Sequence, residues 1–261
     1  KEILDIMRSA KVNFWDECHM CAAPTLLEIA RKSNAEHVYG LSASPWRDDG
    51  QDMLIESIFG STIVNVPASR LIREGYLVKP YIKFQNVPTM KGLPKNYQTV
   101  YKKYIIENEV RNQKIIKGAV KLVEQGFRPL VLFSKVNHGK LLYNEISKQI
   151  PAALLSGKDS KDTRDKAKES LENDDIHCIV ASTIFDVGVD LPKLSGLIVA
   201  GGGKSSVRAL QRVGRVIRSY PDKTHAAVID YVDSAPYLKN HSITRYKIYS
   251  SEEEFSVTWP R

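Results

Sequence analysis

The run His177-Cys178-Ile179-Val180-Ala181 decides the fold, because it is one of five short apolar runs that recur toward the C-terminus. Each run is about as long as a buried strand, and several of the stretches between them are long enough for a helix. Strands that alternate with helices form a parallel sheet whose faces the helices cover. The predicted strands are Pro129–Ser134, Ala152–Leu155, His177–Ala181, Gly196–Ala200 and His225–Tyr231.

A shorter α/β pattern comes first in the chain. The apolar run Val12–Trp15 predicts a short buried strand, a helix begins at Pro24, and His37–Leu41 predicts the next strand. Ligands of α/β sheets bind at the carboxyl ends of the strands. The residues that follow Trp15 and Leu41 are therefore candidates for a site.

Prolines and a glycine between Pro80 and Pro94, with little periodicity, predict a linker. We therefore expect part of one domain at residues 1–80, a linker at 81–96 and a second domain at 97–261. The second domain should open with one long helix over Tyr97–Glu124. A further helix packed on the sheet is predicted within Tyr237–Val257.

Arginines are regularly spaced in the stretch Gln211-Arg212-Val213-Gly214-Arg215-Val216-Ile217-Arg218. A helix that begins near Ser205 or Ser206 would put Gln211, Arg215 and Arg218 on one face, since residues three and four apart are neighbours. Guanidinium groups are planar and always charged, and they bind phosphate oxygens in pairs. The stretch therefore predicts phosphate recognition, and its alternative is a solvated basic helix.

The strand at Val12–Trp15 is followed directly by Asp16-Glu17-Cys18-His19. An aspartate at a strand end can hold Mg²⁺ through water, and the neighbouring glutamate can polarise a water for hydrolysis. The next strand ends in Ser42-Ala43-Ser44, whose hydroxyls can hydrogen-bond a carboxylate. Taken alone, the two motifs also fit a pair of surface acids and a Ser-Pro turn.

Polar residues also follow two strands of the second domain. Ser134, Lys135 and Asn137 can meet a nucleic-acid phosphate, although Ser134 or Asn137 could equally cap a helix. The stretch from Ser182 to Asp190 is the second strong signal, with a plain Gly-Val-Asp turn as its alternative. Gly201-Gly202-Gly203-Lys204-Ser205 is not a phosphate-binding P-loop, because Ile198 stands where that motif requires glycine. We expect a flexible strand-to-helix turn there.

Together these motifs resemble those of superfamily 2 helicases, in the family's order. Asp16–His19 looks like the DEAD/DEAH box, Ser42–Ser44 like motif III, Phe133–Asn137 like motif IV, Ser182–Asp190 like motif V and Gln211–Arg218 like motif VI. Stretches between these motifs look like the XPB/UvsW-like branch, a resemblance that is consistent with a phage or bacterial source: Arg47–Gly50, Phe59-Gly60 and Leu71–Pro80. The resemblance implies the C-terminal part of a first RecA-like domain and a complete second RecA-like domain, each a parallel sheet flanked by helices.

The resemblance also implies roles for the motif residues. Asp16, Glu17, Gln211, Arg215 and Arg218 would be catalytic, with Mg²⁺ on Asp16 and ATP between the two domains. The nucleotide side would include His19, which couples the acidic box to motif III, together with Ser42, Ser44, Gly188 and Asp190. The nucleic-acid side would include Ser134, Lys135, Asn137, Ser182 and Thr183. The chain departs from the usual pattern with Ser44 and Ser182 for threonine and with Val187 for a carboxylate.

Motif I, which binds the β- and γ-phosphates, is expected before Lys1, so this chain alone should hydrolyse ATP weakly. The resemblance favours a DNA helicase or translocase that acts on single-stranded, duplex or branched DNA in repair, recombination or replication. Three alternatives stay open at this point: a non-catalytic nucleic-acid-binding module, a motor subunit of a restriction or remodelling complex, and an RNA helicase.

Composition fits these expectations. The net charge of +8 favours a polyanionic partner, and we expect no membrane partner. The sequence has no run of about 18 apolar residues and no secretory leader, so the cytoplasm, or a host's cytoplasm for a phage protein, is expected. The three cysteines suggest reduced thiols, although Cys18 and Cys21 have redox spacing.

Overall fold

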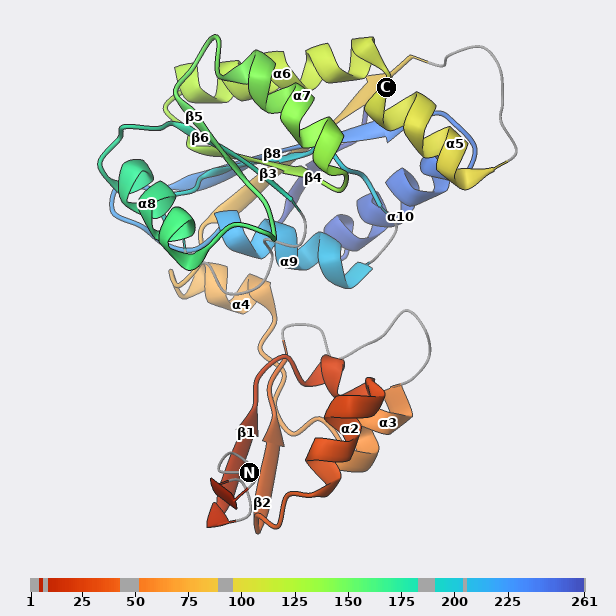
Figure 1. Ribbon diagram of the computed structural model, residues 1–261, viewed down its shortest axis with the longest axis vertical. Helices are drawn as coiled ribbons and strands as arrows, with labels where there is room; N and C mark the ends of the chain where they lie inside the picture. The colour runs from red at the N-terminus through yellow and green to blue at the C-terminus, as the bar shows by residue number, and fades with distance from the viewer. Residues whose placement is uncertain are drawn as a thin grey trace. The chain divides into compact units, whose positions relative to one another are not determined.

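The chain divides into two compact units, residues 1–66 and 67–261. The structure, a computed structural model, describes residues 5–6, 9–42, 52–88, 96–182, 191–203 and 206–260. Each unit has its own parallel sheet with helices packed against it (Figure 1).

The first unit pairs β1 (Val12–Trp15) with β2 (His37–Gly40) in a parallel ladder. Between and after them lie a 3₁₀ turn and two helices: η1 (Cys18–Ala22), α2 (Pro24–Arg31) and α3 (Asp52–Phe59). Cys18 and Ile55 pack with Trp15 and Phe59 in a small core. The expected strands and helix start are confirmed, but β1 is not buried on both faces, because Phe14 is 68% exposed and stacks on Tyr39.

The second unit is a seven-stranded sheet in the order β5-β6-β4-β7-β8-β3-β9, with every pair parallel. Its strands are β3 (Lys79–Val87), β4 (Pro129–Phe133), β5 (Ala152–Leu155), β6 (Cys178–Ser182), β7 (Gly196–Val199), β8 (His225–Asp233) and β9 (Ser256–Thr258). The five strands predicted from the apolar runs are confirmed to within two residues at each end. A parallel sheet with helix crossovers confirms the predicted α/β class.

Helices cover both faces of this sheet (Figure 1). Helices α6 (Glu109–Glu124) and α7 (Val136–Ile146) pack on one face, and α8 (Lys161–Glu172), α9 (Ser206–Val216) and α10 (Leu238–Ser250) pack on the other. The short α4 (Ala68–Arg73) adds Ala68 and Ile72 to the latter layer.

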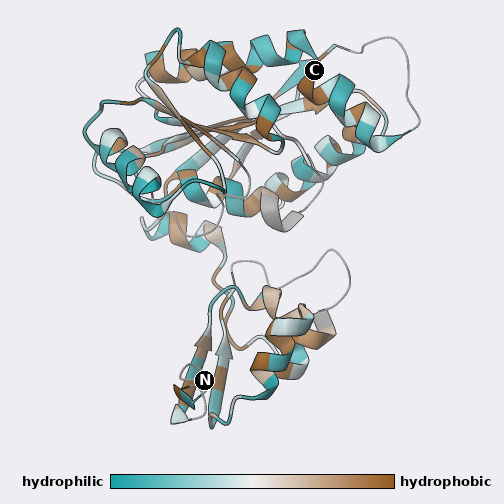
Figure 2. Cartoon of the chain, in the orientation of Figure 1, coloured by the Kyte–Doolittle hydropathy of each residue, from teal (hydrophilic) through white to brown (hydrophobic). Residues whose placement is uncertain are grey.

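The central strands are apolar on both sides, because successive side chains point to opposite faces and each face has its own core. Val131 and Phe133 point to the α6 and α7 layer, whereas Leu130 and Leu132 point to the other layer. In Figure 2 these central strands are hydrophobic, whereas the helices that cover them carry both hydrophobic and hydrophilic residues. The rigid sheet fixes where each strand ends, which is where the candidate site residues lie.

The predicted linker at 81–96 is wrong over its first part. Residues Lys79–Val87 form β3, which pairs with β8 over nine residues, and Ile82 and Phe84 are buried in the core. The division between the units falls instead after Val66. Prolines at Pro80 and Pro88 suggested a loop, but they stand near the two ends of the strand, where proline is tolerated.

The predicted single helix over Tyr97–Glu124 is also wrong in part. It consists of α5 (Tyr97–Tyr101), a π-helical turn η2 (Lys102–Ile106) and α6. The break occurs because Asn108 caps a new helix, with its side-chain oxygen accepting from Arg111 N at 3.1 Å. The predicted C-terminal helix ends at Ser250, and residues Ser256–Thr258 then pair with β3 as the edge strand β9.

Candidate functional site

Strand pairing in the first unit brings the acidic motif beside the small-hydroxyl motif. Beyond the ends of β1 and β2, Leu41 N donates to Trp15 O at 2.8 Å, and Cys18 N donates to Leu41 O at 2.9 Å. Gly40 allows this close approach, because a methyl group there would lie 2.8 Å from the Phe59 ring and 2.9 Å from Cys18 Cβ. Residues 16–19 and 41–42 therefore form one cluster at the carboxyl edge of the two strands.

His19 stands at the centre of this cluster. Its Nδ1 atom lies 3.0 Å from Ser42 Oγ and 3.2 Å from Glu17 Oε2. Glu17 adopts a left-handed backbone conformation with φ of 51°, which turns its carboxylate back toward the histidine. Glu17 Oε2 is buried without a hydrogen bond among the described residues, so His19 is its polar neighbour. The predicted neighbours Glu17, His19 and Ser42 are thus brought together, whereas Ser44 lies outside the described residues.

The donor set at this edge suits a magnesium ion held by few protein atoms. Asp16 is exposed, and its Oδ1 accepts from Glu17 N at 2.9 Å. Within the described residues there is no group of three or more metal-binding side chains. Mg²⁺ keeps several waters and uses one or two carboxylates together with substrate phosphates. The exposed carboxylate of Asp16 fits this mode of binding.

The cysteines of the acidic motif are structural. Cys18 and Cys21 are both free and buried, and burial raises the pKa of each thiol. A raised pKa keeps sulfur in the unreactive thiol form. Cys18 instead packs against Ile55 in the small core. These observations argue against the redox role that the spacing allowed.

Two serines of the second unit lie at the carboxyl edge of adjacent strands. Ser182 ends β6, and it is the register partner of Phe133 at the end of β4, just before Ser134. Ser182 is 5% exposed, and its hydroxyl has no hydrogen-bond partner among the described residues. An unsatisfied buried hydroxyl at a strand end is the kind of group that a ligand or water completes.

Ser134, Lys135 and Asn137 are exposed at the start of α7. The capping residue of this helix is Lys135, and its side chain makes no capping hydrogen bond. Neither Ser134 nor Asn137 is therefore the helix cap that the sequence allowed as an alternative. Thr183, Gly188 and Asp190 lie outside the described residues.

The arginine motif forms α9 and the residues directly after it. The helix begins at Ser206, as predicted, and Gln211 and Arg215 lie one turn apart on it, both partly exposed. The prediction that Arg218 shares this helix face is wrong, because the helix ends at Val216. Arg218 instead pairs antiparallel with Leu77, and its carbonyl accepts from Lys223 Nζ at 2.7 Å. This pairing joins the residues after α9 to the entry of β3, so the helix cannot continue.

The glycines before α9 form a tightly packed turn. Gly201 packs so closely on Ser134 that a methyl group would overlap Ser134 Oγ and lie 2.8 Å from Ser134 N. Gly203 has φ of 109°, a conformation that only glycine adopts readily. The expected turn is confirmed over these residues, and its carbonyls accept hydrogen bonds from side chains of several helices.

The side chains that hold this turn were not predicted from the sequence. Arg111 and Arg245 are fully buried and bind Asp233 and Asp230. A signal was present in the sequence, since two aspartates in an otherwise apolar strand require buried partners. Their partners lie in distant helices, so the sequence alone did not identify them.

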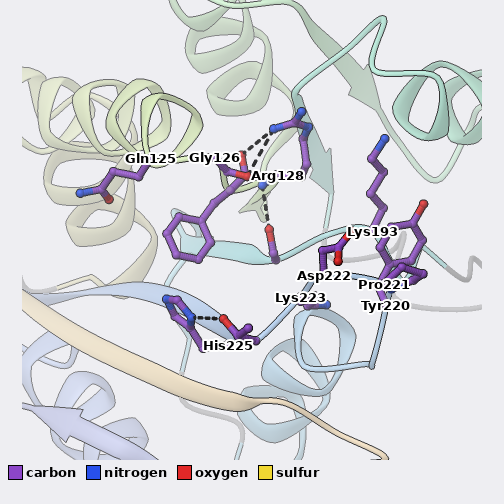
Figure 3. Close-up of a pocket in the computed structure, with 12 residues that line it drawn as sticks. Gln125, Gly126, Arg128, Lys193, Tyr220, Pro221, Asp222, Lys223 and His225 are labelled. Carbon is purple, nitrogen blue, oxygen red and sulfur yellow. Dashed lines mark hydrogen bonds between the residues drawn. The ribbon is translucent and has the colours of Figure 1, made fainter.

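A pocket of about 280 Å³ lies at the opposite edge of the sheet, where the strands begin. Figure 3 shows Arg128, Lys193 and Lys223 around it. Asp174 binds both Arg128 and Lys193, and carbonyl oxygens surround Lys223. These cations are engaged within the protein, so the candidate site remains at the carboxyl edge.

Comparison with known proteins gives a consistent result. Residues 112–220 match the helicase conserved C-terminal domain. The chain is 29% identical to the ATP-dependent DNA helicase UvsW of enterobacteria phage T4, over 91% of this chain and 52% of that protein. It is 25% identical to the DNA 3'-5' translocase XPB2 of Sulfurisphaera tokodaii, over 78% of this chain and 55% of that protein. The chain thus spans about half the length of these curated relatives.

Solved structures agree on the fold. The crystal structure of T4 UvsW covers 98% of this chain with a TM-score of 0.56 at 25% identity, and the match takes in 54% of that chain. Yeast Dbp5 bound to RNA and ADP BeF3 covers 98% of this chain with a TM-score of 0.63 at 14% identity, over 62% of that chain. At 14% identity this likeness supports the RecA-like fold alone. No helix within the described residues is long and apolar enough to cross a membrane. The chain therefore contains a stretch that matches the helicase conserved C-terminal domain, and it is similar to the helicase UvsW and the translocase XPB2 over about half of their length.

Proposed function

We propose that this chain is part of an ATP-dependent DNA helicase or translocase, and that it supplies residues for ATP hydrolysis from both of its units. The observation that carries the proposal is the cluster in which His19 lies between Glu17 and Ser42. A carboxylate whose orientation depends on a histidine and a serine from the neighbouring strand end can respond to the state of a bound nucleotide. A pair of surface acids would not require that arrangement.

Asp16 and Glu17 carry the chemistry of the first unit. Asp16 is exposed at the strand end and would hold the metal through water. The bound Mg²⁺ would neutralise charge on the phosphates of ATP. Glu17 orients the attacking water and accepts its proton, a contribution worth about 10²-fold or more in rate.

Arg215 and Gln211 carry the chemistry of the second unit. The guanidinium group of Arg215 stabilises the charge that develops on the transferred phosphoryl group. Gln211 lies one turn earlier and is placed to bind the same phosphates or the attacking water. Arg218 follows the helix end and does not share the helix face. Its backbone is positioned instead by the bridge with Leu77 and by the hydrogen bond from Lys223.

Nucleic acid is the proposed partner of the exposed start of α7 and the end of β6. Ser134, Lys135 and Asn137 offer a hydroxyl, a cation and an amide, and Ser182 offers an unsatisfied hydroxyl nearby. Such groups bind phosphates without reading base sequence. Thr183, which follows Ser182 in the chain, completes the proposed nucleic-acid set, whereas Gly188 and Asp190 belong to the proposed nucleotide side with His19, Ser42 and Ser44. DNA is favoured over RNA because the relatives UvsW and XPB2 are named as acting on DNA.

The test is ATP hydrolysis by the complete protein, with and without nucleic acid. Arg215→Ala should lower the stimulated rate by about 10³-fold, and Glu17→Gln by about 10²-fold. Arg70→Ala is the matched control, because this exposed arginine in α4 pairs with Glu74 one turn away. Hydrolysis that survives Arg215→Ala would overturn the proposed role of α9.

Further outcomes separate the kinds of motor. Stimulation by single-stranded or branched DNA, together with strand displacement, supports a helicase. Triplex displacement without strand separation supports a duplex translocase of the kind used in restriction or remodelling complexes. Stronger stimulation by RNA would favour an RNA helicase, and binding without hydrolysis would favour a non-catalytic module.

A further inference from the structure

Four successive carbonyl oxygens after β7 each accept a hydrogen bond from a different side chain. Ala200 O accepts from Arg111 Nη1 at 2.6 Å, and Gly201 O accepts from the Tyr101 hydroxyl at 2.8 Å. Gly202 O accepts from Arg212 Nη1 at 3.0 Å, and Gly203 O accepts from Arg245 Nη1 at 2.6 Å. The donors come from four helices, α6, α5, α9 and α10. We call residues Gly201–Gly203 the glycine turn.

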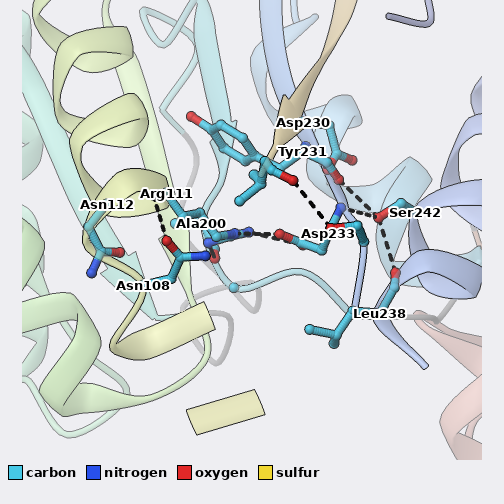
Figure 4. Close-up of polar contacts among 12 residues, drawn as sticks. Asn108, Arg111, Asn112, Ala200, Asp230, Tyr231, Asp233, Leu238 and Ser242 are labelled. Carbon is cyan, nitrogen blue, oxygen red and sulfur yellow. Dashed lines mark hydrogen bonds and ion pairs between the residues drawn. The ribbon is translucent and has the colours of Figure 1, made fainter. Parts of the chain in front are cut away.

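Two buried ion pairs hold the donors in place. Arg111 Nε donates to Asp233 Oδ1 at 2.8 Å, and its guanidinium lies 4.9 Å from the centre of the Tyr231 ring. Figure 4 shows Arg111 between Asp233 and the carbonyl of Ala200. Arg245 binds Asp230 through two nitrogens at 2.8 and 2.7 Å. Asp230 also accepts from Tyr231 N at 2.6 Å.

Burial of these ion pairs carries a large desolvation cost. Arg111, Arg245 and Asp230 are at most 1% exposed, and desolvation of two charges can cancel the attraction between them. A buried pair is therefore weak support for stability, whereas its directed hydrogen bonds fix one geometry well. The geometry that these pairs fix is the path of the glycine turn.

The glycine turn connects two parts of the proposed site. On one side Gly201 packs on Ser134, at the proposed nucleic-acid surface, with no room for a methyl group between them. A hydrogen bond with Ser134 also reaches the Tyr101 hydroxyl, where it opposes the burial that raises the pKa of Tyr101. On the other side Gly202 O is bound by Arg212, which directly follows Gln211 and lies one turn before Arg215.

We propose that the glycine turn couples nucleic-acid contact at Ser134 to the placement of Gln211 and Arg215, and that Arg245 is its principal positioning residue. This inference rests on the proposed function. A phosphate bound at Ser134 shifts the start of α7, and Gly201 must follow because the two are in close contact. Since the turn is held by its carbonyls, the shift passes to Arg212 and hence to α9.

The experiment replaces the Arg245–Asp230 pair without leaving a buried charge. The double variant Asp230→Asn with Arg245→Met removes both charges and the bond to Gly203 O. The matched control makes the same two changes at Arg128 and Asp174, a pair at the opposite edge of the sheet that does not touch the turn. ATP hydrolysis by the complete protein is measured with and without oligo(dT), together with the KM for ATP and the thermal unfolding midpoint.

We expect the Asp230→Asn, Arg245→Met protein to lose about tenfold in stimulation by oligo(dT), a coupling loss of ordinary size. Its KM for ATP should stay close to wild type, and the control pair should retain full stimulation. Tyr101→Phe is a milder variant that removes only the hydroxyl that donates to Gly201 O. It should fold normally and lose about threefold in stimulation by oligo(dT), which corresponds to roughly half of a typical hydrogen bond.

The outcomes are distinct. Folded variants at both Arg245 and Tyr101 that keep wild-type stimulation would overturn the coupling role and leave the proposed function standing. If the double variant does not fold, Tyr101→Phe alone decides in the same way. A wild-type protein without any nucleic-acid-stimulated hydrolysis would overturn the proposed function, and this inference with it.

Discussion

His19 Nδ1 lies 3.0 Å from Ser42 Oγ, although 22 residues separate them along the chain. The same nitrogen lies 3.2 Å from Glu17 Oε2. One imidazole therefore contacts the carboxylate of one strand end and the hydroxyl of the next. The hydrogen bond is the physical link that the acidic box and the small-hydroxyl motif require if they act together.

Ser42→Ala should lower nucleic-acid-stimulated ATP hydrolysis by about tenfold, because His19 loses a hydrogen bond worth about 1 kcal/mol and orients Glu17 less well. The measurement is the steady-state rate of the complete protein. Ser57→Ala is the control, since the Ser57 hydroxyl is exposed and donates to Leu54 O within its own helix. Equal rates for the two variants would contradict a coupling role for Ser42.

The His138→Gln protein should lose less stability than wild type as pH falls. His138 is fully buried, and burial, helped by Arg111, lowers its pKa from 6.5 to about 3. The unfolded chain therefore binds a proton near pH 6.5, whereas the folded chain binds it only near pH 3. The free energy of unfolding consequently falls as pH decreases through this window. Glutamine cannot titrate, and its amide can still reach Asn112, the partner of His138 Nε2 at 2.8 Å.

Denaturant unfolding between pH 7 and 4 measures this effect. The free energy of unfolding of wild type should fall by several kcal/mol more than that of His138→Gln. A His138→Gln protein that loses as much stability as wild type over this range would contradict the role of His138. Asp174 does not interfere, because hydrogen bonds from Lys193 and Arg128 lower its pKa from 3.8 to about 2, which moves its own contribution to lower pH.

Lys223→Met should lower the free energy of unfolding by about 2 kcal/mol, within the range for hydrogen bonds to charged groups. Lys223 Nζ donates to the carbonyls of Pro192, Leu194 and Arg218 at 3.0, 2.6 and 2.7 Å. Burial lowers the pKa of Lys223 to about 8, so at pH 7 the group carries its proton and all three donors. Chemical denaturation at pH 7 measures the change. Lys239→Met, at an exposed position in α10, should cost less than about 0.5 kcal/mol.

Arg111→Met should cost about 3–5 kcal/mol, because Asp233 is left buried without its cation. Burial already raises the pKa of Asp233, and Arg111 is the main group that opposes this shift. Adding Asp233→Asn should recover most of the loss by removing the buried charge. Denaturant unfolding of the single and double variants measures both steps. A single variant as stable as Arg128→Met, which disturbs a solvent-exposed pair, would show that Arg111 is not essential to the fold.

Local pattern predicted the structure where the structural cause was itself local. The apolar runs at Leu130–Phe133 and Cys178–Ala181 predicted buried strands because both of their faces are covered. The start of α9 and the positions of Asp16, Glu17 and Ser42 at strand ends also followed from the sequence. Prolines misled the prediction at β3, whose place in the sheet depends on pairing with β8 about 145 residues later.

Sequence by itself determined the α/β class, the strand ends and the order of the motifs, because apolar period and small-residue signals act over a few neighbouring residues. Tertiary structure alone decided that Arg218 leaves the helix to pair with Leu77, and that the backbone of Gly201–Gly203 is held by donors from several helices. The reason is physical. A buried arginine or an unpaired carbonyl must be satisfied, but the partner that satisfies it is chosen by proximity in the folded chain and leaves no spacing rule in the sequence.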